Sequence, residues 1–305
     1  EENKYPSTNI KINNFIEHLD LIKKKEIEFI NPNNFEEALK KQKNDKKILL
    51  TIDDGFKSFY ENAWPTLKKR KIPFVLFVNT REVGSYGYMN WTQINEIAKE
   101  KFVHIGNHSF SHEYLIDKKN EEIIYDINQA ISDFKNNIGY NSPFFSYPFG
   151  EYSNDFKKII KELGFKYAFG QHSGVADESK NFYELPRFPI NEAYGDIKRF
   201  ETILKTIPLK FKSIKPEEKY ITDVNNPPQV IIEFFDNLKN IKLLKCYSNE
   251  KNSWRESKLE YLKDFKIKIN LVGKFTTERG RINCSLREPD GSWRWLGIQF
   301  VIKNL

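Results

Sequence analysis

The feature of this sequence that most restricts its fold is a regular alternation of short apolar runs with helical stretches, which begins near residue 45. Between the runs, apolar residues recur at helical spacing. A strand followed by a helix pairs in parallel with the next strand, because the helix carries the chain back across the sheet. We therefore predict an α/β unit whose parallel sheet is open or closed into a barrel. The expected strands are residues 47–53, 73–78, 102–107, 143–148, 165–170 and 185–190.

The pattern changes near residues 207–230, where four prolines and the run Asn-Asn-Pro-Pro indicate a linker. Beyond this segment, apolar runs are separated by turn residues such as Pro289-Asp290-Gly291, which is typical of a β-rich domain. We therefore expect a first domain of residues 1–206, a linker of residues 207–230, and a small sandwich-like domain of residues 231–305.

Charge and hydropathy argue against several classes of protein. The formal net charge is +7, but the lysines are scattered through the helical stretches, whereas nucleic-acid binding calls for a concentrated basic patch. No run approaches the ~20 apolar residues of a membrane span. The first residues, Glu1-Glu2-Asn3, carry no signal-peptide pattern. We expect neither a nucleic-acid partner nor a membrane span, and nothing indicates the oligomeric state.

Two neighbouring carboxylates, Asp53 and Asp54, end the first expected strand. Like charges at this separation raise each other's cost of ionisation, so a compensating group is expected. A bound cation, an arginine or a shared proton would each provide that compensation.

Two histidines, His108 and His112, follow the third expected strand. On a helical turn, this spacing of four places both imidazoles on one face, where they can share a metal ion. The histidine pair and the aspartate pair both lie just past the carboxyl ends of expected parallel strands, where sites form in α/β sheets. Two histidines and one carboxylate form a triad suited to Zn²⁺ or a related ion, with positions left open for water and substrate.

Three motifs in this region resemble those of the polysaccharide deacetylases, also called NodB-homology or carbohydrate esterase family 4 enzymes. They are TIDDG at residues 51–55, HSFSH at residues 108–112 and SYPFG at residues 146–150. They stand in the order of that family, and the resemblance covers about residues 45–195. It implies a distorted or incomplete (β/α) barrel of the NodB-homology type as the catalytic domain, followed here by the small β-rich domain.

By this resemblance, Asp54, His108 and His112 hold a divalent metal, with Zn²⁺ favoured and Co²⁺ or Ni²⁺ as alternatives. Asp53 is then the general base for a metal-bound water that attacks an acetamide carbonyl. The implied activity is removal of N-acetyl groups from an N-acetylated amino-sugar polysaccharide. The YPFG and LPR segments favour the branch that acts on poly-N-acetylglucosamine.

The third motif is implied to form the substrate and oxyanion part of the site. It supplies Tyr147, Pro148, Phe149 and Gly150, with a backbone N–H near Tyr147 as the oxyanion donor. The motif also departs from the family pattern, because Ser146 replaces the arginine that opens it and steadies the base.

Two further residues are candidates for the arginine that steadies the base and for the general acid. Arg187, in the segment LPRFP, is expected to replace the missing arginine, with a surface salt bridge as the alternative. His172, in the segment FGQHSG, is expected to be the general acid, with an ordinary loop residue as the alternative. His104 is assigned to packing, and His18 is expected to be solvated.

Two cysteines, Cys246 and Cys284, lie in the β-rich part. They pair in an oxidising compartment and stay as small buried hydrophobes in the cytosol. The family resemblance implies a periplasmic or secreted protein. Three tryptophans and three arginines in this part form either a sugar-stacking face or part of the core: Trp254, Trp293, Trp295, Arg281, Arg287 and Arg294.

Three other functions stay open. The first is hydrolysis of a small non-sugar amide on the same fold. A closed pocket would indicate this function, whereas a long open groove would indicate a polymer substrate. The second is carbohydrate binding by a protein whose catalytic site has decayed. The third is a purely structural metal, which requires a fourth protein ligand that the sequence does not reveal.

Overall fold

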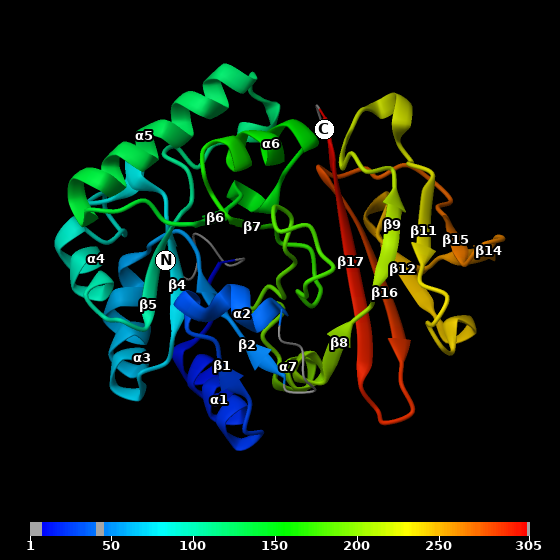
Figure 1. Ribbon diagram of the computed structural model, residues 1–305, viewed down its shortest axis with the longest axis horizontal. Helices are drawn as coiled ribbons and strands as arrows, with labels where there is room; N and C mark the ends of the chain where they lie inside the picture. The colour runs from blue at the N-terminus through cyan, green and yellow to red at the C-terminus, as the bar shows by residue number, and fades with distance from the viewer. Residues whose placement is uncertain (1–7, 41–45, 304–305) are drawn as a thin grey trace. The chain divides into compact units, whose positions relative to one another are not determined.

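The computed structural model describes residues 8–40 and 46–303 (Figure 1). Residues 1–7, at the start of the predicted first domain, lie outside this description. The chain forms two compact units, each assembled from several segments. Unit 1 comprises Glu1–Pro148, Ile159–Ala168 and Pro189–Leu204, and unit 2 comprises Phe149–Lys158, Phe169–Phe188 and Lys205–Leu305. The domain boundaries expected from the sequence stay a prediction.

A five-stranded sheet of parallel strands organises unit 1, and its strands follow one another in chain order. The interior strand β4 is buried along its whole length, as expected for a strand covered on both faces. The sheet is curled into an open half-barrel, which confirms the predicted α/β class and the incomplete barrel (Figure 1). Its strands are β3 (Leu50–Ile52), β4 (Phe74–Val78), β5 (Val103–Asn107), β6 (Phe144–Ser146) and β7 (Tyr167–Phe169).

The strand expected at residues 185–190 is not formed, so this prediction was wrong. Its one ladder contact is an isolated bridge between Phe169 and Leu185. The reason lies in Pro186 and Pro189, which have no N–H to donate to a neighbouring strand.

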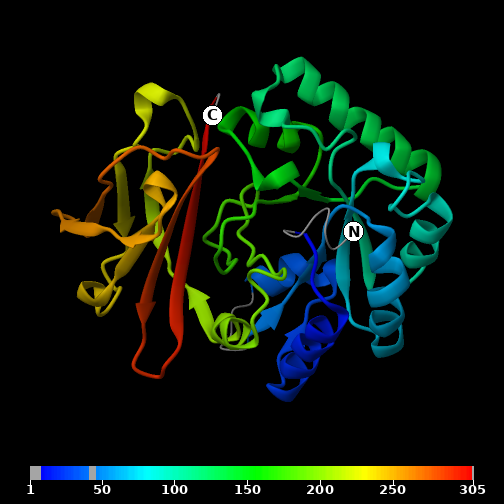
Figure 2. The ribbon, with the colours of Figure 1, turned by 180° about the vertical axis from the view of Figure 1, so that it is seen from behind.

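Helices cover the sheet of unit 1. The apolar faces of α3, α4 and α5 pack on β4, and both ribbon views show these helices along one face of the sheet (Figures 1 and 2). Helix α4 begins at a capping box formed by Asn90 and Gln93, and α5 ends at Gly139 in a left-handed conformation. The helices are α1 (Ile12–Lys24), α2 (Phe35–Lys40), α3 (Trp64–Arg70), α4 (Trp91–Ala98), α5 (Asn120–Ile138), α6 (Asn154–Glu162) and α7 (Ile197–Leu204). A short parallel pair, β1 (Glu28–Phe29) and β2 (Lys47–Ile48), also lies in unit 1.

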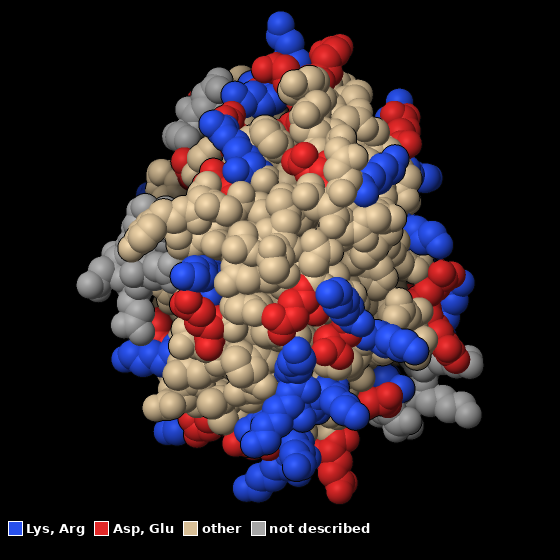
Figure 3. All heavy atoms as spheres, turned by 90° about the vertical axis from the view of Figure 1, so that its left-hand side faces the viewer, with Lys and Arg blue, Asp and Glu red and all other residues tan. Residues whose placement is uncertain are grey.

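Charged side chains of both signs lie on the face shown in Figure 3. Lys and Arg gather toward its lower edge with Asp and Glu beside them, and an uncharged band crosses its middle. Several basic residues of unit 1 are paired, as Lys68 is with Glu96 at 2.9 Å. Within the described ranges, no helix combines the length and apolarity needed to cross a membrane.

Unit 2 is β-rich, as predicted, and contains two sheets. One has the order β10-β17-β16-β12-β13 with β8 also paired to β17, and the other has the order β14-β15-β11-β9. Figure 2 shows β16 and β17 as a long hairpin, which closes at the turn containing Gly291. The strands are β8 (Thr206–Pro208), β9 (Phe211–Lys215), β10 (Tyr220–Ile221), β11 (Val230–Phe234), β12 (Lys245–Ser248), β13 (Arg255–Glu256), β14 (Lys258–Tyr261), β15 (Lys266–Asn270), β16 (Arg279–Arg287) and β17 (Trp293–Ile302). The segment expected to be a linker thus contributes strands to both sheets.

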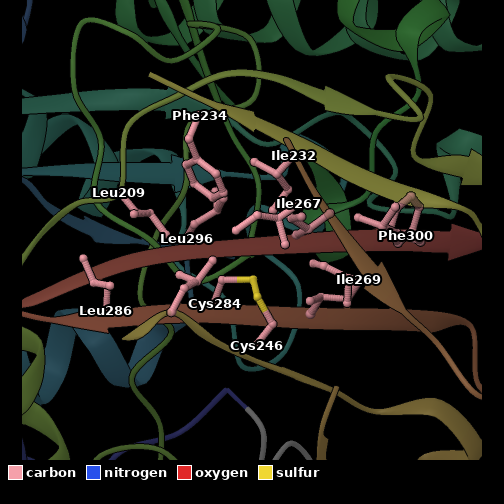
Figure 4. Close-up of a cluster of buried hydrophobic side chains, with 14 of the residues drawn as sticks. Leu209, Ile232, Phe234, Cys246, Ile267, Ile269, Cys284, Leu286, Leu296 and Phe300 are labelled. Atoms are coloured by element: carbon pink, nitrogen blue, oxygen red, sulfur yellow. A yellow bond between two sulfur atoms is a disulfide. The ribbon is translucent and has the colours of Figure 1, made fainter. Parts of the chain in front are cut away.

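The core of unit 2 contains a disulfide. Alternate residues of β12 and β16 are buried, so each strand points one face into the core. Cys246 and Cys284 are directly opposed across this pair of strands, and their sulfurs are bonded inside the apolar cluster (Figure 4).

Candidate active site

The three predicted ligands meet at the carboxyl edge of the sheet of unit 1. Asp54 follows β3, and His108 follows β5. Asp54 Oδ1 lies 3.5 Å from His108 Nε2 and 3.3 Å from His112 Nε2. Together the three residues form a group whose potential ligand atoms all lie within 4.8 Å of one another.

This group fits a divalent metal ion. A tetrahedral ion with bonds of about 2.1 Å to such ligands keeps neighbouring ligand atoms about 3.4 Å apart. Both measured separations are close to that value. The His108 side chain is only 1% exposed, whereas those of Asp54 and His112 are 15% and 21% exposed, so one side of the group is open to solvent.

The tautomer of His108 also suits metal binding. Its Nδ1 lies 2.7 Å from the carbonyl oxygen of Ser146, which can only accept a hydrogen bond. In the neutral ring the proton therefore resides on Nδ1, which leaves the lone pair of Nε2 directed toward the group.

The two histidines come together without a helix, so the expectation of a helical turn was wrong. Residues 108–112 form an irregular loop in which Ser109 has φ of 68° and His112 has φ of 52°. Their ring centroids are nevertheless 4.7 Å apart. The loop takes this path because side-chain acceptors, and not the carbonyls of a helix, receive its amide hydrogens.

Left-handed backbone recurs at the motif residues. Asp54 has φ of 76° and Phe149 has φ of 58°, in addition to the two loop residues above. Such angles are uncommon for residues other than glycine and persist where the surrounding structure imposes them, often at functional sites.

Burial and charge move the pKa values of the two histidines in opposite directions. Burial acts to lower the pKa of His108, but the carboxylates of Asp54 and Asp53 and the Ser146 carbonyl together raise it above its usual value. Burial, followed by the neighbouring His108, lowers the pKa of His112 to about 4. His112 is therefore neutral at neutral pH in the metal-free protein, which is the form that binds a metal.

Asp53 is outside the ligand group and faces Ser146. The Ser146 hydroxyl donates to Asp53 Oδ2 at 3.3 Å, and Ser146 is fully buried. Ser146, which replaces the arginine of the family motif, thus contacts the expected base Asp53 through its hydroxyl and His108 through its carbonyl.

The third motif runs from unit 1 into unit 2. The Tyr147 side chain is fully buried and packs on Phe145, so its part in a site would come from its backbone. Gly150 has φ of 72°, and a Cβ there would lie 2.5 Å from the backbone nitrogen of Gln171. Pro148, Phe149 and Gly150 form a short turn after β6.

Arg187 and His172 both belong to unit 2. Arg187 Nε donates to the carbonyl of Gly170 at 2.8 Å, and its backbone N–H donates to the carbonyl of His172. Burial, followed by nearby cations such as Lys180, lowers the pKa of His172 to about 3. This value argues against an imidazolium acid at neutral pH, and both catalytic roles stay predictions.

The remaining histidines lie in packed surroundings. His104 packs between the rings of Tyr140 and Phe144, as predicted. The solvated position expected for His18 was wrong. His18 is 4% exposed, its Nε2 is bonded to the carbonyl of Gly195, and its ring stacks on Phe200 of α7.

The tryptophans of unit 2 differ in exposure. Trp254 is 50% exposed, whereas Trp293 and Trp295 are partly buried on alternate positions of β17. Arg287 lies over the ring of Trp293, and Trp295 donates its indole N–H to Asn283. A sugar-stacking face stays a prediction.

Asp126 is a residue near the site that was not predicted from the sequence. This residue of α5 accepts backbone N–H groups from the loop that carries His112. The available signal was an acid among the apolar residues Ile123, Ile127 and Ala130 on one face of a helix.

Comparison with known proteins links part of the chain to a family. Residues 40–168 match the family model described as polysaccharide deacetylase. The poly-beta-1,6-N-acetyl-D-glucosamine N-deacetylase of Staphylococcus aureus (strain NCTC 8325 / PS 47) is 27% identical over 192 residues. That alignment covers 58% of this chain and 66% of the relative, so the chain spans just under two thirds of the relative's length.

Solved structures share the fold. IcaB from Ammonifex degensii matches with a TM-score of 0.59 and 24% identity over 64% of this chain and 89% of that chain. The Streptococcus pyogenes deacetylase PplD, solved in complex with acetate, matches with a TM-score of 0.58 and 21% identity over 64% of this chain and 87% of that chain. The family match and the three motifs at the carboxyl edge of the half-barrel agree, and residues 40–168 resemble the polysaccharide deacetylase family.

Proposed function

We propose that this protein is a metal-dependent N-deacetylase that removes N-acetyl groups from an amino-sugar polysaccharide. The observation that carries the proposal is the Asp54, His108 and His112 group, with Asp53 adjacent in sequence. Similarity to a relative named for poly-β-1,6-N-acetyl-D-glucosamine supports the substrate class.

We assign a divalent ion to this group, with Zn²⁺ favoured and Co²⁺ or Ni²⁺ as alternatives. Such an ion polarises the acetamide carbonyl and lowers the pKa of water. His108 is oriented for this role by its bond to the Ser146 carbonyl, and Asp54 supplies the negative charge of the ligand set.

Asp53 acts as the general base in this proposal. Its carboxylate, held by the Ser146 hydroxyl, takes a proton from the attacking water as the oxygen bonds to the acetamide carbon. The carbon–nitrogen bond then breaks, and the products are acetate and a free amine. The departing nitrogen needs a proton, and the low pKa of His172 favours Asp53 as the group that returns it.

The test is acetate release from N-acetylglucosamine oligomers of β-1,6 and β-1,4 linkage. Chelator-stripped protein is assayed with and without Zn²⁺, Co²⁺ or Ni²⁺. Metal-restored release supports the proposal, and the preferred linkage identifies the polymer class. Absence of release from both, with metal bound, contradicts it and favours a small-amide hydrolase or a sugar-binding protein.

We also propose that the protein works outside the cytoplasm. The Cys246–Cys284 disulfide supports this, because such bonds persist in oxidising compartments. Alkylation of the protein as it is isolated from its host checks the point, since two reactive thiols would contradict the proposal.

A further inference from the structure

The loop between the two histidines, residues 108–112, is held by side chains. The amide of Ser109 donates to Asn107 Oδ1 at 2.8 Å, and the amide of His112 donates to Ser109 Oγ at 3.0 Å. These acceptors are at most three residues away from their donors, so they shape the loop but do not anchor it to the rest of unit 1.

The two amides in the middle of the loop use a distant acceptor. Phe110 N–H donates to Asp126 Oδ1 at 2.9 Å, and Ser111 N–H donates to Asp126 Oδ2 at 3.1 Å. The two oxygens of one carboxylate on α5 thus accept hydrogen bonds from two consecutive amides. This is a charge-assisted, two-point attachment of the loop to a 19-residue helix.

Asp126 is unusual for its place on the helix. It is 8% exposed and shares the buried face of α5 with Ile123, Ile127 and Ala130. Burial of a carboxylate is costly unless hydrogen bonds compensate for lost hydration. Packing alone would favour an apolar residue here, so the bonds to the loop account for the acid.

The other side of the loop is attached to the segment after β4. Thr80 N–H donates to the carbonyl of Ser109 at 3.2 Å, and Arg81 N–H donates to the carbonyl of Phe110 at 3.0 Å. The loop is therefore held on one side by the segment after β4, which bonds to its carbonyls, and on the other side by Asp126, which bonds to its amides.

We propose that Asp126 is a positioning residue that sets metal affinity by holding His112 beside Asp54. The inference rests on the metal site proposed above. When the carboxylate is removed, two consecutive amides lose their acceptor. The left-handed angles at Ser109 and His112 then lose part of their support, and the imidazole of His112 is no longer held 3.3 Å from Asp54 Oδ1.

The first test compares Zn²⁺ affinity in metal-free protein by competition with a chromophoric chelator. Asp126→Ala is expected to bind Zn²⁺ about 10- to 100-fold more weakly than the wild type, as loss of groups that orient metal ligands usually does. Asp126→Asn keeps one oxygen acceptor, and its Zn²⁺ affinity is expected to lie between those of the wild type and Asp126→Ala. The matched control is Glu122→Ala, which removes an exposed capping contact to Lys119 N–H on the same helix and is expected to leave Zn²⁺ affinity unchanged.

The outcomes separate this inference from the proposed metal site. Equal Zn²⁺ affinity in wild type and Asp126→Ala, or an equal loss in Glu122→Ala, overturns the role of Asp126 and leaves the metal site standing. Failure of the wild type to bind Zn²⁺ overturns both. If Asp126→Ala does not fold, Asp126→Asn decides, because affinity equal to that of the wild type overturns the proposal.

A second measurement does not depend on metal. Amide hydrogen exchange in the metal-free protein is expected to be faster at Phe110 and Ser111 in Asp126→Ala than in the wild type, and unchanged there in Glu122→Ala. Unchanged protection of both amides in folded Asp126→Ala overturns the proposal.

Discussion

At the scale of single residues, Ser146 serves two groups through two atoms. Its carbonyl oxygen accepts from His108 Nδ1 at 2.7 Å, and its hydroxyl donates to Asp53 at 3.3 Å. The first contact depends on the backbone and tolerates many side chains, whereas the second requires a side-chain donor. A hydroxyl supplies a hydrogen bond without the positive charge of the arginine that the family motif has at this position.

The role of Asp53 can be separated from metal binding. Asp53→Asn is expected to retain the metal and to lower kcat by roughly 10²- to 10⁴-fold, because the amide cannot accept the proton. Ser146→Ala keeps the backbone carbonyl that accepts from His108. This variant is expected to retain the metal and to lower kcat less than Asp53→Asn does. Acetate release and metal content measured on the same samples check this, and near-normal turnover in Asp53→Asn would remove Asp53 as the base.

His172 should make stability depend on pH. Its pKa is about 3 in the folded protein against 6.5 as the ordinary value, because burial and nearby cations disfavour the charged ring. The unfolded chain therefore binds a proton in this interval that the folded chain does not. His172 therefore does not lower the free energy of unfolding above pH 6.5. As the pH falls from 6.5 toward 3, protonation of His172 in the unfolded chain lowers that free energy progressively. Urea unfolding across this range should show a shallower decline for His172→Gln, and identical slopes would contradict the assignment.

At the scale of elements, the segments that follow β3, β5 and β6 contain left-handed residues other than glycine. Asp54, Ser109, His112 and Phe149, which follow β3, β5 and β6, are all left-handed. The regular elements provide the rigid support, and the loops aim the side chains.

Gly150 gives a direct test of one such turn. Gly150→Ala is expected to lower the free energy of unfolding by more than ~1 kcal/mol, because a Cβ at φ of 72° would also lie 2.5 Å from the Gln171 nitrogen. Gly164→Ala is the matched control, since Gly164 has φ of 89° and open space around it. Urea denaturation of both variants separates the clash from the backbone cost, and equal losses would show that the clash is relieved.

At the scale of the whole molecule, each unit has its own source of stability. Unit 1 has an apolar core between its sheet and its helices, and unit 2 adds a covalent link to its core. Loss of that link should therefore affect mainly unit 2.

Removal of the disulfide by mutation checks this division. The bond joins residues 38 positions apart, and a crosslink over such a loop contributes about 4 kcal/mol by restricting the unfolded chain. The double variant Cys246→Ala, Cys284→Ala is expected to show lowered hydrogen-exchange protection in β12 and β16, with protection in β4 and β5 retained. Equal losses in both units would mean that they unfold together.

The sequence by itself determined the alternating elements and the residues of the three motifs. Apolar periodicity is a local property, so β4, β5 and the long helix α5 could be predicted from it. Family motifs identified Asp53, Asp54 and the histidine pair, because the residue types and spacing of a motif are also local properties of the sequence.

The tertiary structure alone decided which distant residues serve this site. The bonds from Asp126 to the loop and from Ser146 to Asp53 join segments 16 and 93 residues apart. The burial of His18 against α7 is equally non-local, since its partner Gly195 is 177 residues away. Hydrogen bonds and burial of this kind depend on how elements pack, and packing is set by the whole chain and not by any window of it.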